Sequence, residues 1–398
     1  MSDYIVVVNA GSSSLKFSAY RMSGAAWTLD ARGQIEGIGT APKFSAKDDR
    51  GDKIGEATLD RGVTDAKVAL TYVANWLRER FPGARVCGVG HRVVHGGATY
   101  SGPTVVTPEV LQDLRTLIPL APLHQPYNLS AIDAVWERLP GVPQVACFDT
   151  SFHRNQPAVA QLVPLPREIR EAGVQRYGFH GLSYEYIASV LPSMAPEAAG
   201  GRVVVAHLGS GASMCALKAG KSVDSTLGFT ALDGLCMGTR PGSLDPGVVL
   251  YLFQALGMSA KDVEAMLYKR SGLIGISGIS NDMRGLLASS EPAAGLAIDY
   301  FVYRAAKELA AMAAALGGID GLVFTAGIGE NSPEIRKRIC AASAWLGIML
   351  DEDANARTAQ RISTASSTVP VWVIPTNEEL MIARHTGGLL GLGGQTPS

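Results

Sequence analysis

The sequence has few of the features that mark nucleic-acid-binding or membrane proteins. It contains no block of one charge, and 35 basic against 36 acidic residues leave a formal net charge of -1. A nucleic-acid or polyanion partner therefore has no electrostatic support. The most apolar helical stretch, residues 303–316, is interrupted by Arg304, Lys307 and Glu308 and is too short to cross a bilayer. We therefore expect neither a nucleic-acid partner nor a membrane partner.

Cysteines are few and show no pairing pattern. The five cysteines are scattered and odd in number, with no C-x-x-C pair, which predicts reduced thiols rather than disulfides. The first residues carry an acid and lead into a strand pattern instead of a basic flank and an apolar helix. No signal peptide is therefore predicted, and we expect a cytoplasmic protein.

Two common nucleotide-binding fingerprints are also missing. The sequence has no G-x-x-x-x-G-K-[ST], and no G-x-G-x-x-G that follows a strand and opens a helix. This argues against a P-loop enzyme and against a nicotinamide-dependent dehydrogenase. The length of 398 residues exceeds what one hydrophobic core usually supports, so two domains are expected.

The beginning of the chain predicts a strand, a turn that suits phosphate and a second strand. Residues 5–8 are apolar and mostly β-branched, and the turn at Gly11 presents glycine and serine donors. For this stretch alone, an ordinary hairpin with a polar tip is the simpler interpretation. Residues 203–213 repeat the pattern, however, because at an offset of 198 residues Gly11 and Ser12 fall on Gly209 and Ser210. We interpret the repeat as a duplicated domain with a nucleotide between the copies.

Strand and helix patterns alternate in both halves, which predicts an α/β protein. Strands are expected at residues 86–89, 142–148, 321–325 and 369–374, and helices at 66–81, 107–117, 128–139, 183–191, 246–256, 259–268, 292–316 and from 380. Residues 326–333 are expected to form a loop before a helix, with backbone donors for phosphate or adenosine.

Candidate catalytic residues follow two of the predicted strands. Arg92, which precedes two glycines, can hold a carboxylate or phosphate through two parallel hydrogen bonds. A salt bridge to a nearby acid is an equal alternative. Asp149 suits Mg²⁺ or the ordering of a reacting group, although it could instead cap the next helix. His91 and His95 have an H-x-x-x-H spacing, but after a strand they do not share a face, so no metal site is predicted there.

Two further candidates lie in irregular segments. His180 stands between an aromatic residue and a glycine, and Arg240 stands among glycines and prolines within residues 224–245. A long loop that carries an arginine among glycines and prolines is more often functional than decorative, so Arg240 is a candidate functional residue. His180 places a second imidazole ahead of the helix predicted at 183–191.

The motifs together closely resemble those of the acetate kinase family. In order they read N-A-G-S-S-S-L-K-F, G-H-R-V-V-H-G-G, F-D-T-S-F-H, Y-G-F-H-G, H-L-G-x-G-A-S, M-G-T-R, N-D-M-R, A-G-I-G-E-N-S and P-T-N-E-E-L. They run from Asn9 to Leu380 in the family's order, so the resemblance covers nearly the whole chain. Propionate kinases and other short-chain acyl kinases share most of them.

The resemblance implies reversible transfer of the γ-phosphoryl group of ATP to acetate, giving ADP and acetyl phosphate. It implies Mg²⁺ as the metal cofactor, with Mn²⁺ as a substitute. It implies two duplicated RNase H-like domains of the actin and hexokinase type, with a nucleotide cleft between them. The first domain would comprise residues 1–150 with a C-terminal helix at 384–398, and the second residues 151–383. The second domains would pair in a homodimer.

The resemblance also implies roles for matching residues. Asn9 and Glu378 would be linked to magnesium, and Lys16 would approach the nucleotide phosphates. Arg92 would hold the substrate carboxylate, Asp149 would be the acidic catalytic residue, and His180 and Arg240 would stabilise the transition state. The ATP site would include His207, Leu208, Gly209, Ser210, Gly211, Asp282, Met283, Arg284, Gly327, Ile328, Gly329, Glu330 and Asn331. The acyl pocket would be bordered by Val94, Leu123, Phe179 and Ala231.

Elementary chemistry restricts one of these roles. A carboxylic acid has a pKa of about 4 to 5, so acetate is ionised at neutral pH and needs no base. Asp149 is therefore expected to organise Mg²⁺ and water. The chain departs from the family at Ser210, usually asparagine, at Ala231, usually proline, and at Asp233, usually glutamate. Ala231 predicts a roomier pocket that accepts propionate.

A second class of function uses the same fold. ATP-driven chaperones and filament proteins bind nucleotide without phosphorylating a small molecule. Arg92, His180 and Arg240, all suited to an anionic acceptor, argue against that class. Trapping acetyl phosphate with hydroxylamine distinguishes an acetate-phosphorylating enzyme from a chaperone or filament protein.

Overall fold

The chain folds into two α/β units in a computed structural model, which describes residues 2–24 and 26–392. The first unit contains the chain up to Ser151 and returns at Asn377, and the second runs from Phe152 to Thr376. These boundaries were predicted at residues 150 and 384. The last helix, α16 (Glu378–Leu389), lies wholly within the first unit, and residues 393–398 of the helix expected at 384–398 lie outside the described residues.

The first unit is built on an eight-stranded sheet with the order β5-β4-β3-β2-β1-β6-β8-β7. Its strands are β1 (Asp3–Ala10), β2 (Ser14–Ser23), β3 (Ala26–Glu36), β4 (Lys43–Lys47), β5 (Lys53–Thr58), β6 (Arg85–Val93), β7 (Thr104–Val105) and β8 (Gln144–Phe148). Its other helices are α1 (Ala66–Arg80), α2 (Pro108–Thr116), the 3-10 turn η1 (Ile118–Leu120) and α3 (Gln125–Arg138), and the 3-10 turn η2 (Ser151–His153) follows β8.

The second unit is built on a five-stranded sheet with the order β11-β10-β9-β12-β13. Its strands are β9 (Arg202–Leu208), β10 (Ala212–Lys218), β11 (Lys221–Ser225), β12 (Gly321–Thr325) and β13 (Val371–Val373). Its helices are α4 (Ala158–Gln161), α5 (Arg167–Glu171), α6 (Gly181–Met194), α7 (Pro196–Ala199), α8 (Pro246–Gln254), α9 (Ala260–Lys269), α10 (Gly272–Ser277), α11 (Met283–Leu287), α12 (Pro292–Leu316), α13 (Ala326–Asn331), α14 (Pro333–Ala342), the 3-10 turn η3 (Ala344–Leu346) and α15 (Glu352–Ala356).

The two sheets repeat one topology, which confirms the duplication predicted from the sequence. In the first unit β3, β2 and β1 are antiparallel neighbours, and β1, β6 and β8 are parallel. In the second unit β11, β10 and β9 are antiparallel in the same way, and β9, β12 and β13 are parallel. Each central antiparallel pair closes on a glycine-containing turn, which begins at Gly11 in one unit and at Gly209 in the other.

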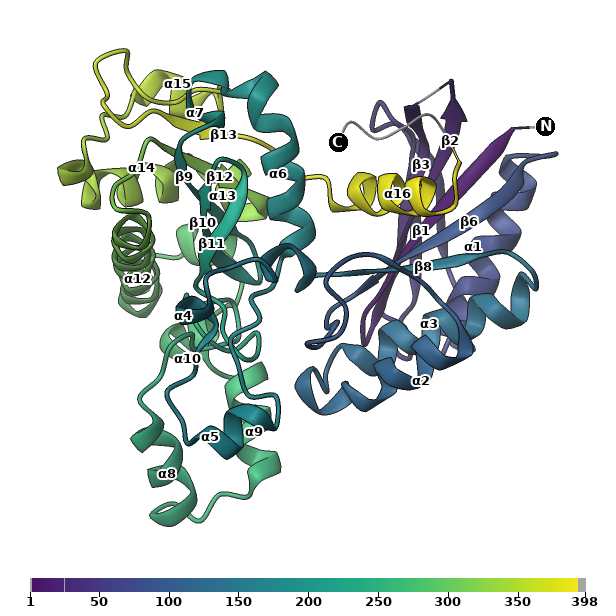
Figure 1. Ribbon diagram of the computed structural model, residues 1–398, viewed down its shortest axis with the longest axis horizontal. Coiled ribbons are helices and arrows are strands. Elements are labelled where there is room, and N and C mark those ends of the chain that lie inside the picture. Colours follow the sequence, from purple (N-terminus) through teal and green to yellow (C-terminus); the bar gives the residue numbers. More distant parts are fainter. Residues whose placement is uncertain (1, 25, 393–398) are drawn as a thin grey trace. The chain divides into compact units, whose positions relative to one another are not determined.

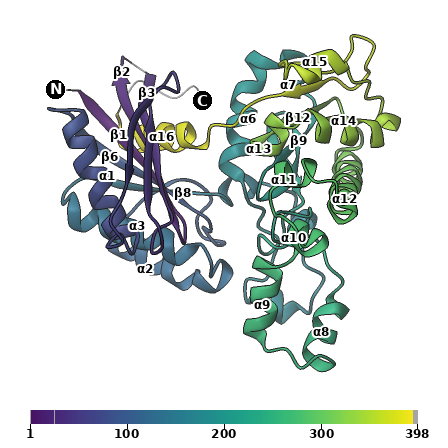
Figure 2. The same ribbon diagram turned by 180° about the vertical axis from the view of Figure 1, so that it is seen from behind.

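Helices cover both faces of each sheet. In the second unit α6 packs on one side of β9, and α12 packs on β9 and β10 from the other side, with α14 packed against α12 (Figures 1 and 2). In the first unit α1 and α3 cover one face and α16 lies against β1, β6 and β8 on the other (Figure 1). Gly88 and Gly90 permit that approach, since a Cβ on either would collide with side chains of α16 such as Thr386 and Ile382.

Several predicted helix ends are confirmed. Thr107 caps α2 through its side chain with Pro108 at the first position, Ser259 caps α9, and α12 has the predicted bounds. Residues 326–331, expected as a loop, form the short helix α13, so that prediction was wrong. None of the helices within residues 2–24 and 26–392 combines the length and apolarity needed to span a bilayer.

Candidate active site

The first group of candidate residues gathers at the carboxyl ends of the parallel strands of the first unit. Asn9 lies near the end of β1 and pairs in register with Lys16 of β2. Between the two strands the Gly11 N–H donates to the Ser14 carbonyl at 2.8 Å, and Ser12 and Ser13 are exposed at the tip of the turn. The turn therefore has the open donors that were predicted for it.

Arg92 and Asp149 form a two-hydrogen-bond ion pair at the ends of neighbouring strands. Arg92 Nε donates to Asp149 Oδ1 at 3.0 Å and Nη2 donates to Oδ2 at 2.7 Å. The Asp149 side chain is 3% exposed and that of Arg92 is 21% exposed. The salt bridge that the sequence left as an alternative is thus present. It leaves Arg92 Nη1 without a hydrogen bond to any described residue.

Glu378, the first residue of α16, joins this group. Its Oε2 lies 3.8 Å from Arg92 Nε. Burial raises the pKa of Glu378 to about 7, the positive charge of Arg92 opposes that shift, and the negative charges of Asp149 and Glu379 add to it. A second cation at this place would favour the charged form of Glu378.

The oxygen atoms of this group suit Mg²⁺. No three His, Cys, Asp or Glu side chains form a metal-ligand cluster within the described residues. Mg²⁺ does not need such a cluster, because it usually keeps several waters and takes one or two carboxylates together with substrate phosphates. Asn9 supplies an amide oxygen, and Glu378 and Asp149 supply carboxylates that are crowded by like charge. The residues present therefore fit the ion.

Two buried amides, which the sequence analysis did not identify, position the loop after β6. The Asn128 side chain accepts from the Val94 N–H at 3.0 Å and donates to the Ala10 carbonyl at 2.7 Å, so it joins the ends of β1 and β6. Gln125 accepts from the His95 N–H at 3.2 Å and donates to its carbonyl at 3.0 Å. No sequence signal marked either amide, because Gln125 precedes the helix predicted at 128–139 and Asn128 is only its first residue.

The second group of candidates lies in the second unit around His180, which caps α6. His180 has a positive φ of 57°, a conformation that is uncommon for a residue with a side chain. Its Nδ1 lies 2.8 Å from Ser213 Oγ, and the buried Tyr184 hydroxyl bonds the same oxygen. The ring stacks on His207 with centroids 4.2 Å apart. These contacts fix the orientation of the His180 ring.

His180 and Arg240 converge on Gly211. A Cβ built on Gly211 would lie 2.7 Å from Arg240 Nη2 and 3.3 Å from His180 Nε2. Arg240 Nη1 donates to the Ala231 carbonyl at 2.6 Å, which orients the guanidinium. Glycine leaves room here for both side chains, so a guanidinium and an imidazole lie together over one turn of backbone.

A cavity of about 460 Å³ in the second unit brings three of the predicted nucleotide motifs together. It is lined by Gly209, Ser210, Asn281, Asp282, Met283, Arg284, Leu287, Gly327, Ile328, Asn331 and Ser332. Gly209 and Ser210 belong to the same turn as Gly211, so the cavity adjoins the backbone on which His180 and Arg240 converge. Its volume lies within the range of about 300–1,000 Å³ that is typical of small-molecule sites.

Other predicted nucleotide residues do not line this cavity. Leu208 is fully buried in β9. Gly329 is buried within α13, and the Glu330 carboxylate accepts from the Ala326 N–H at 2.7 Å and the Thr376 N–H at 3.1 Å. Glu330 therefore supports the start of α13, whereas His207 supports the ring of His180. Lys16 belongs to the first unit.

The residues expected around the acyl group are divided between the units. Val94 and Leu123 belong to the first, and Phe179 and Ala231 belong to the second. The carbonyl of Phe179 is bonded by Nε2 of the buried His153 at 2.9 Å, a contact that the sequence did not indicate.

Comparisons with known proteins agree over the length of the chain. The model of the Acetokinase family matches residues 4–384. An acetate kinase of Rhodopseudomonas palustris is 55% identical over 390 residues, with 97% of this chain and 98% of the relative covered. An acetate kinase structure from Porphyromonas gingivalis has a TM-score of 0.87 at 36% identity and covers 98% of this chain and 100% of its own. A propionate kinase structure from Francisella tularensis has a TM-score of 0.90 at 37% identity and covers 96% of this chain and 99% of its own.

Proposed function

Because the chain belongs to the acetokinase family, we propose that it reversibly transfers the γ-phosphoryl group of ATP to acetate, giving ADP and acetyl phosphate. The observation that carries this proposal is the convergence of His180 and Arg240 on Gly211, in the turn that also borders the nucleotide cavity. A guanidinium and an imidazole at that place suit the equatorial oxygens of a transferring phosphoryl group.

The acceptor needs alignment but no deprotonation. Acetate is already a carboxylate at neutral pH, and Arg92 Nη1 is the donor available to hold it. Asp149 is occupied by both of its hydrogen bonds to Arg92, so we assign it the task of orienting that guanidinium. The proposal requires Arg92, His180 and Arg240 to act on one reacting complex.

Asn9 and Glu378 would hold Mg²⁺, with Asp149 near them. When bound, the ion would neutralise charge on the phosphates of the nucleotide. Lys16 lies opposite Asn9 in the β1 and β2 register and would add positive charge to the same phosphates. Mn²⁺ accepts similar oxygen ligands and is the expected substitute.

The activity is tested by incubating the full chain with ATP, Mg²⁺ and acetate and trapping acetyl phosphate with hydroxylamine. We expect hydroxamate formation that depends on acetate and falls by about a hundredfold in Arg240→Ala. ATP hydrolysis without hydroxamate would contradict the proposal and favour a nucleotide-driven chaperone or filament protein.

Propionate is a second candidate acceptor. The Francisella tularensis relative is described as a propionate kinase, and this chain has Ala231 where a proline is usual. One methylene is worth only about 1–3 kcal/mol of discrimination in a pocket of this kind. Comparing kcat/KM on acetate, propionate and butyrate decides between the two, and a collapse of activity on propionate would exclude the roomier pocket.

We further propose that the protein is a cytoplasmic homodimer. Its five cysteines, all within the described part of the chain, are free, as expected in a reducing compartment. Helices α8 and α12 of the second unit expose large apolar side chains, among them Leu250, Tyr251, Leu296 and Tyr303 at 54%, 57%, 61% and 64%. Such surfaces commonly mark protein contacts. Light scattering on the wild type and on Tyr303→Glu tests this, and a monomeric wild type would contradict it.

A further inference from the structure

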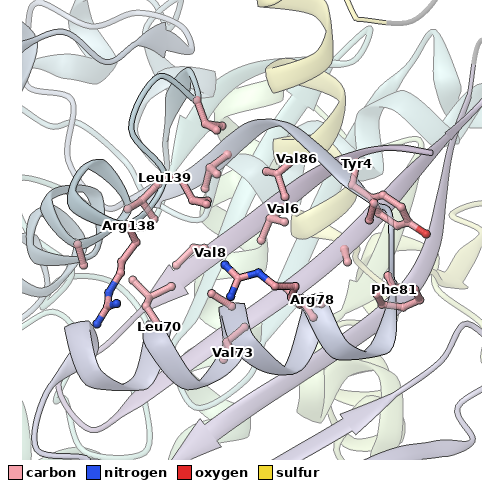
Figure 3. Close-up of a pocket in the computed structure, with 18 of the residues that line it drawn as sticks. Tyr4, Val6, Val8, Leu70, Val73, Arg78, Phe81, Val86, Arg138 and Leu139 are labelled. Atoms are coloured by element: carbon pink, nitrogen blue, oxygen red, sulfur yellow. The ribbon is translucent and has the colours of Figure 1, made fainter. Parts of the chain in front are cut away.

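A second cavity lies inside the first unit, apart from the candidate active site. It has a volume of about 300 Å³ and lies between the sheet and the helices α1 and α3 (Figure 3). None of the residues assigned to acetate, nucleotide or Mg²⁺ lines it. A ligand in this cavity would bind without any contact to those residues.

The walls of the cavity are almost entirely aliphatic. Val6 and Val8 come from β1, Val89 from β6, Val73 from α1 and Leu139 from the residue after α3. Connecting segments also line the cavity, through Gly83, Ala84 and Val142, so its walls combine core side chains with the ends of loops. An apolar surface of this kind favours an alkyl or aryl group over water.

Two arginines are the only charged residues that line the cavity. Arg78 comes from α1 and Arg138 from the end of α3, and both side chains are drawn beside the aliphatic walls in Figure 3. Arg78 Nη1 bonds the amide oxygen of Asn75 at 3.3 Å, and within residues 2–24 and 26–392 neither arginine has an ion pair. The cavity thus combines an apolar interior with positive charge and no carboxylate to neutralise it.

The remaining polar group of the wall is already engaged. The Tyr4 hydroxyl donates to Asp30 at 2.7 Å, and Asp30 is held by Arg21 at 2.7 Å. The interior therefore offers no pattern of donors and acceptors that would suit a nucleotide, a sugar or a peptide backbone. A ligand needs one anionic group for the arginines and a plain hydrocarbon body.

We propose that this cavity binds a medium-chain carboxylate, with its alkyl chain between β1, β6 and α1 and its carboxylate between Arg78 and Arg138. Acetate has too little apolar surface to gain from these walls, which separates the site from that of the reaction. A hydrocarbon chain gains about 0.8 kcal/mol from each buried methylene, which corresponds to about a fourfold gain in affinity per carbon.

Calorimetric titration of the full chain with hexanoate, octanoate and decanoate, below their micelle concentrations, tests the proposal. We expect affinity to rise about fourfold per methylene until the cavity is filled and then to level off. Octanol and octylammonium should bind about tenfold more weakly than octanoate, because they lack the anionic group. Equal binding of the three would overturn the role of the arginines, and affinity independent of chain length would overturn the site.

Substitutions inside and outside the cavity test whether octanoate binds there. Arg78→Gln with Arg138→Gln should weaken octanoate about tenfold and leave octanol unchanged, whereas Arg80→Gln, exposed on the same helix and outside the cavity, should change neither. Ala74→Phe, at a half-buried lining position, should abolish both. Arg92→Ala should retain octanoate binding. Loss in Arg92→Ala, or retention in Ala74→Phe with unchanged thermal stability, would place the ligand elsewhere and overturn the proposal.

Discussion

Arg92 and Asp149 face each other across the ends of two parallel strands, joined by hydrogen bonds of 3.0 and 2.7 Å. A second pair of the same kind stands at the opposite end of β6, where Arg85 donates to Asp3 at 2.8 and 2.7 Å. The first pair is largely buried and the second is exposed on its arginine side. The exposed pair at one end of β6 can therefore serve as the control for substitutions in the buried pair at the other end.

Asp149→Asn should lower kcat by about a hundredfold, because the guanidinium loses the charge that orients it. It should also lower the free energy of unfolding by about 3 kcal/mol, since a buried arginine loses its counter-ion. Steady-state kinetics and urea unfolding measure the two effects. Asp3→Asn should leave both nearly unchanged, and equal losses of activity in the two variants would disprove the assignment.

Gly211→Ala should lower kcat by about a hundredfold while the protein stays folded. The added methyl group would lie 2.7 Å from Arg240 Nη2 and displace the flexible end of that side chain. Gly200→Ala is the matched control, since a Cβ there has open space. Kinetics and thermal unfolding of both variants check the prediction, which fails if Gly211→Ala retains wild-type turnover.

Ser213→Ala should lower kcat about tenfold with little change in the KM for ATP. Ser213 Oγ is bonded by both the His180 ring and the Tyr184 hydroxyl, so its loss would free the ring for which we propose a contact with the reacting group. Tyr184→Phe keeps the serine and should have a smaller effect. A change confined to the KM for ATP would instead assign Ser213 to nucleotide binding.

Acid should destabilise the protein partly through His91. Burial lowers the pKa of His91 from 6.5 to about 4, and its Nε2 bonds Gln144 at 2.7 Å. Below pH 6.5 His91 is therefore protonated in the unfolded chain but stays neutral in the folded chain. The protein loses stability as the pH falls toward 4. The loss should amount to about 3 kcal/mol. Urea unfolding at several pH values should show that the free energy of unfolding falls less with pH in His91→Gln than in the wild type. Equal losses in the two proteins would contradict the role of His91.

Ala231→Pro should reduce the preference for propionate over acetate by about tenfold, because the proline ring would occupy part of the acyl pocket that we propose. The Ala231 carbonyl, which accepts from Arg240, is kept in the variant. Within the described residues the Ala231 N–H makes no hydrogen bond that a proline would remove. The ratio of kcat/KM for the two acids measures the effect, and an unchanged ratio would show that residue 231 does not border the substrate.

Local sequence patterns were sufficient for the repeated architecture. The β-branched run and glycine turn that recur at Gly209 predicted two equivalent hairpins, and both are present. The capping threonine and proline predicted the start of α2. Such features depend on neighbouring residues, whose effects are visible in one stretch of sequence.

Contacts between segments that are distant in the chain could not be predicted from the sequence. Residues 326–331 were expected as a loop, but the Glu330 carboxylate accepts the Thr376 N–H, 46 residues away, together with the Ala326 N–H, and stabilises a short helix. For Arg92, sequence could not choose between a substrate anion and a salt bridge, because its partner Asp149 lies 57 residues away. Ser213 and Asn128 gave no signal, since their roles depend on groups that only folding brings near.

Because the chain returns to the first unit at Asn377, that unit cannot be completed until the second unit has been synthesised. A ribosome produces the whole second unit before it produces α16, so the glycine-lined face of β6 stays bare until translation is nearly finished. A transcript truncated just after codon 376 would yield a polypeptide that contains every residue lining the cavity of the second unit but lacks Glu378 and leaves the first sheet uncovered. Such a fragment should be a substrate for chaperones and proteases instead of a partial enzyme.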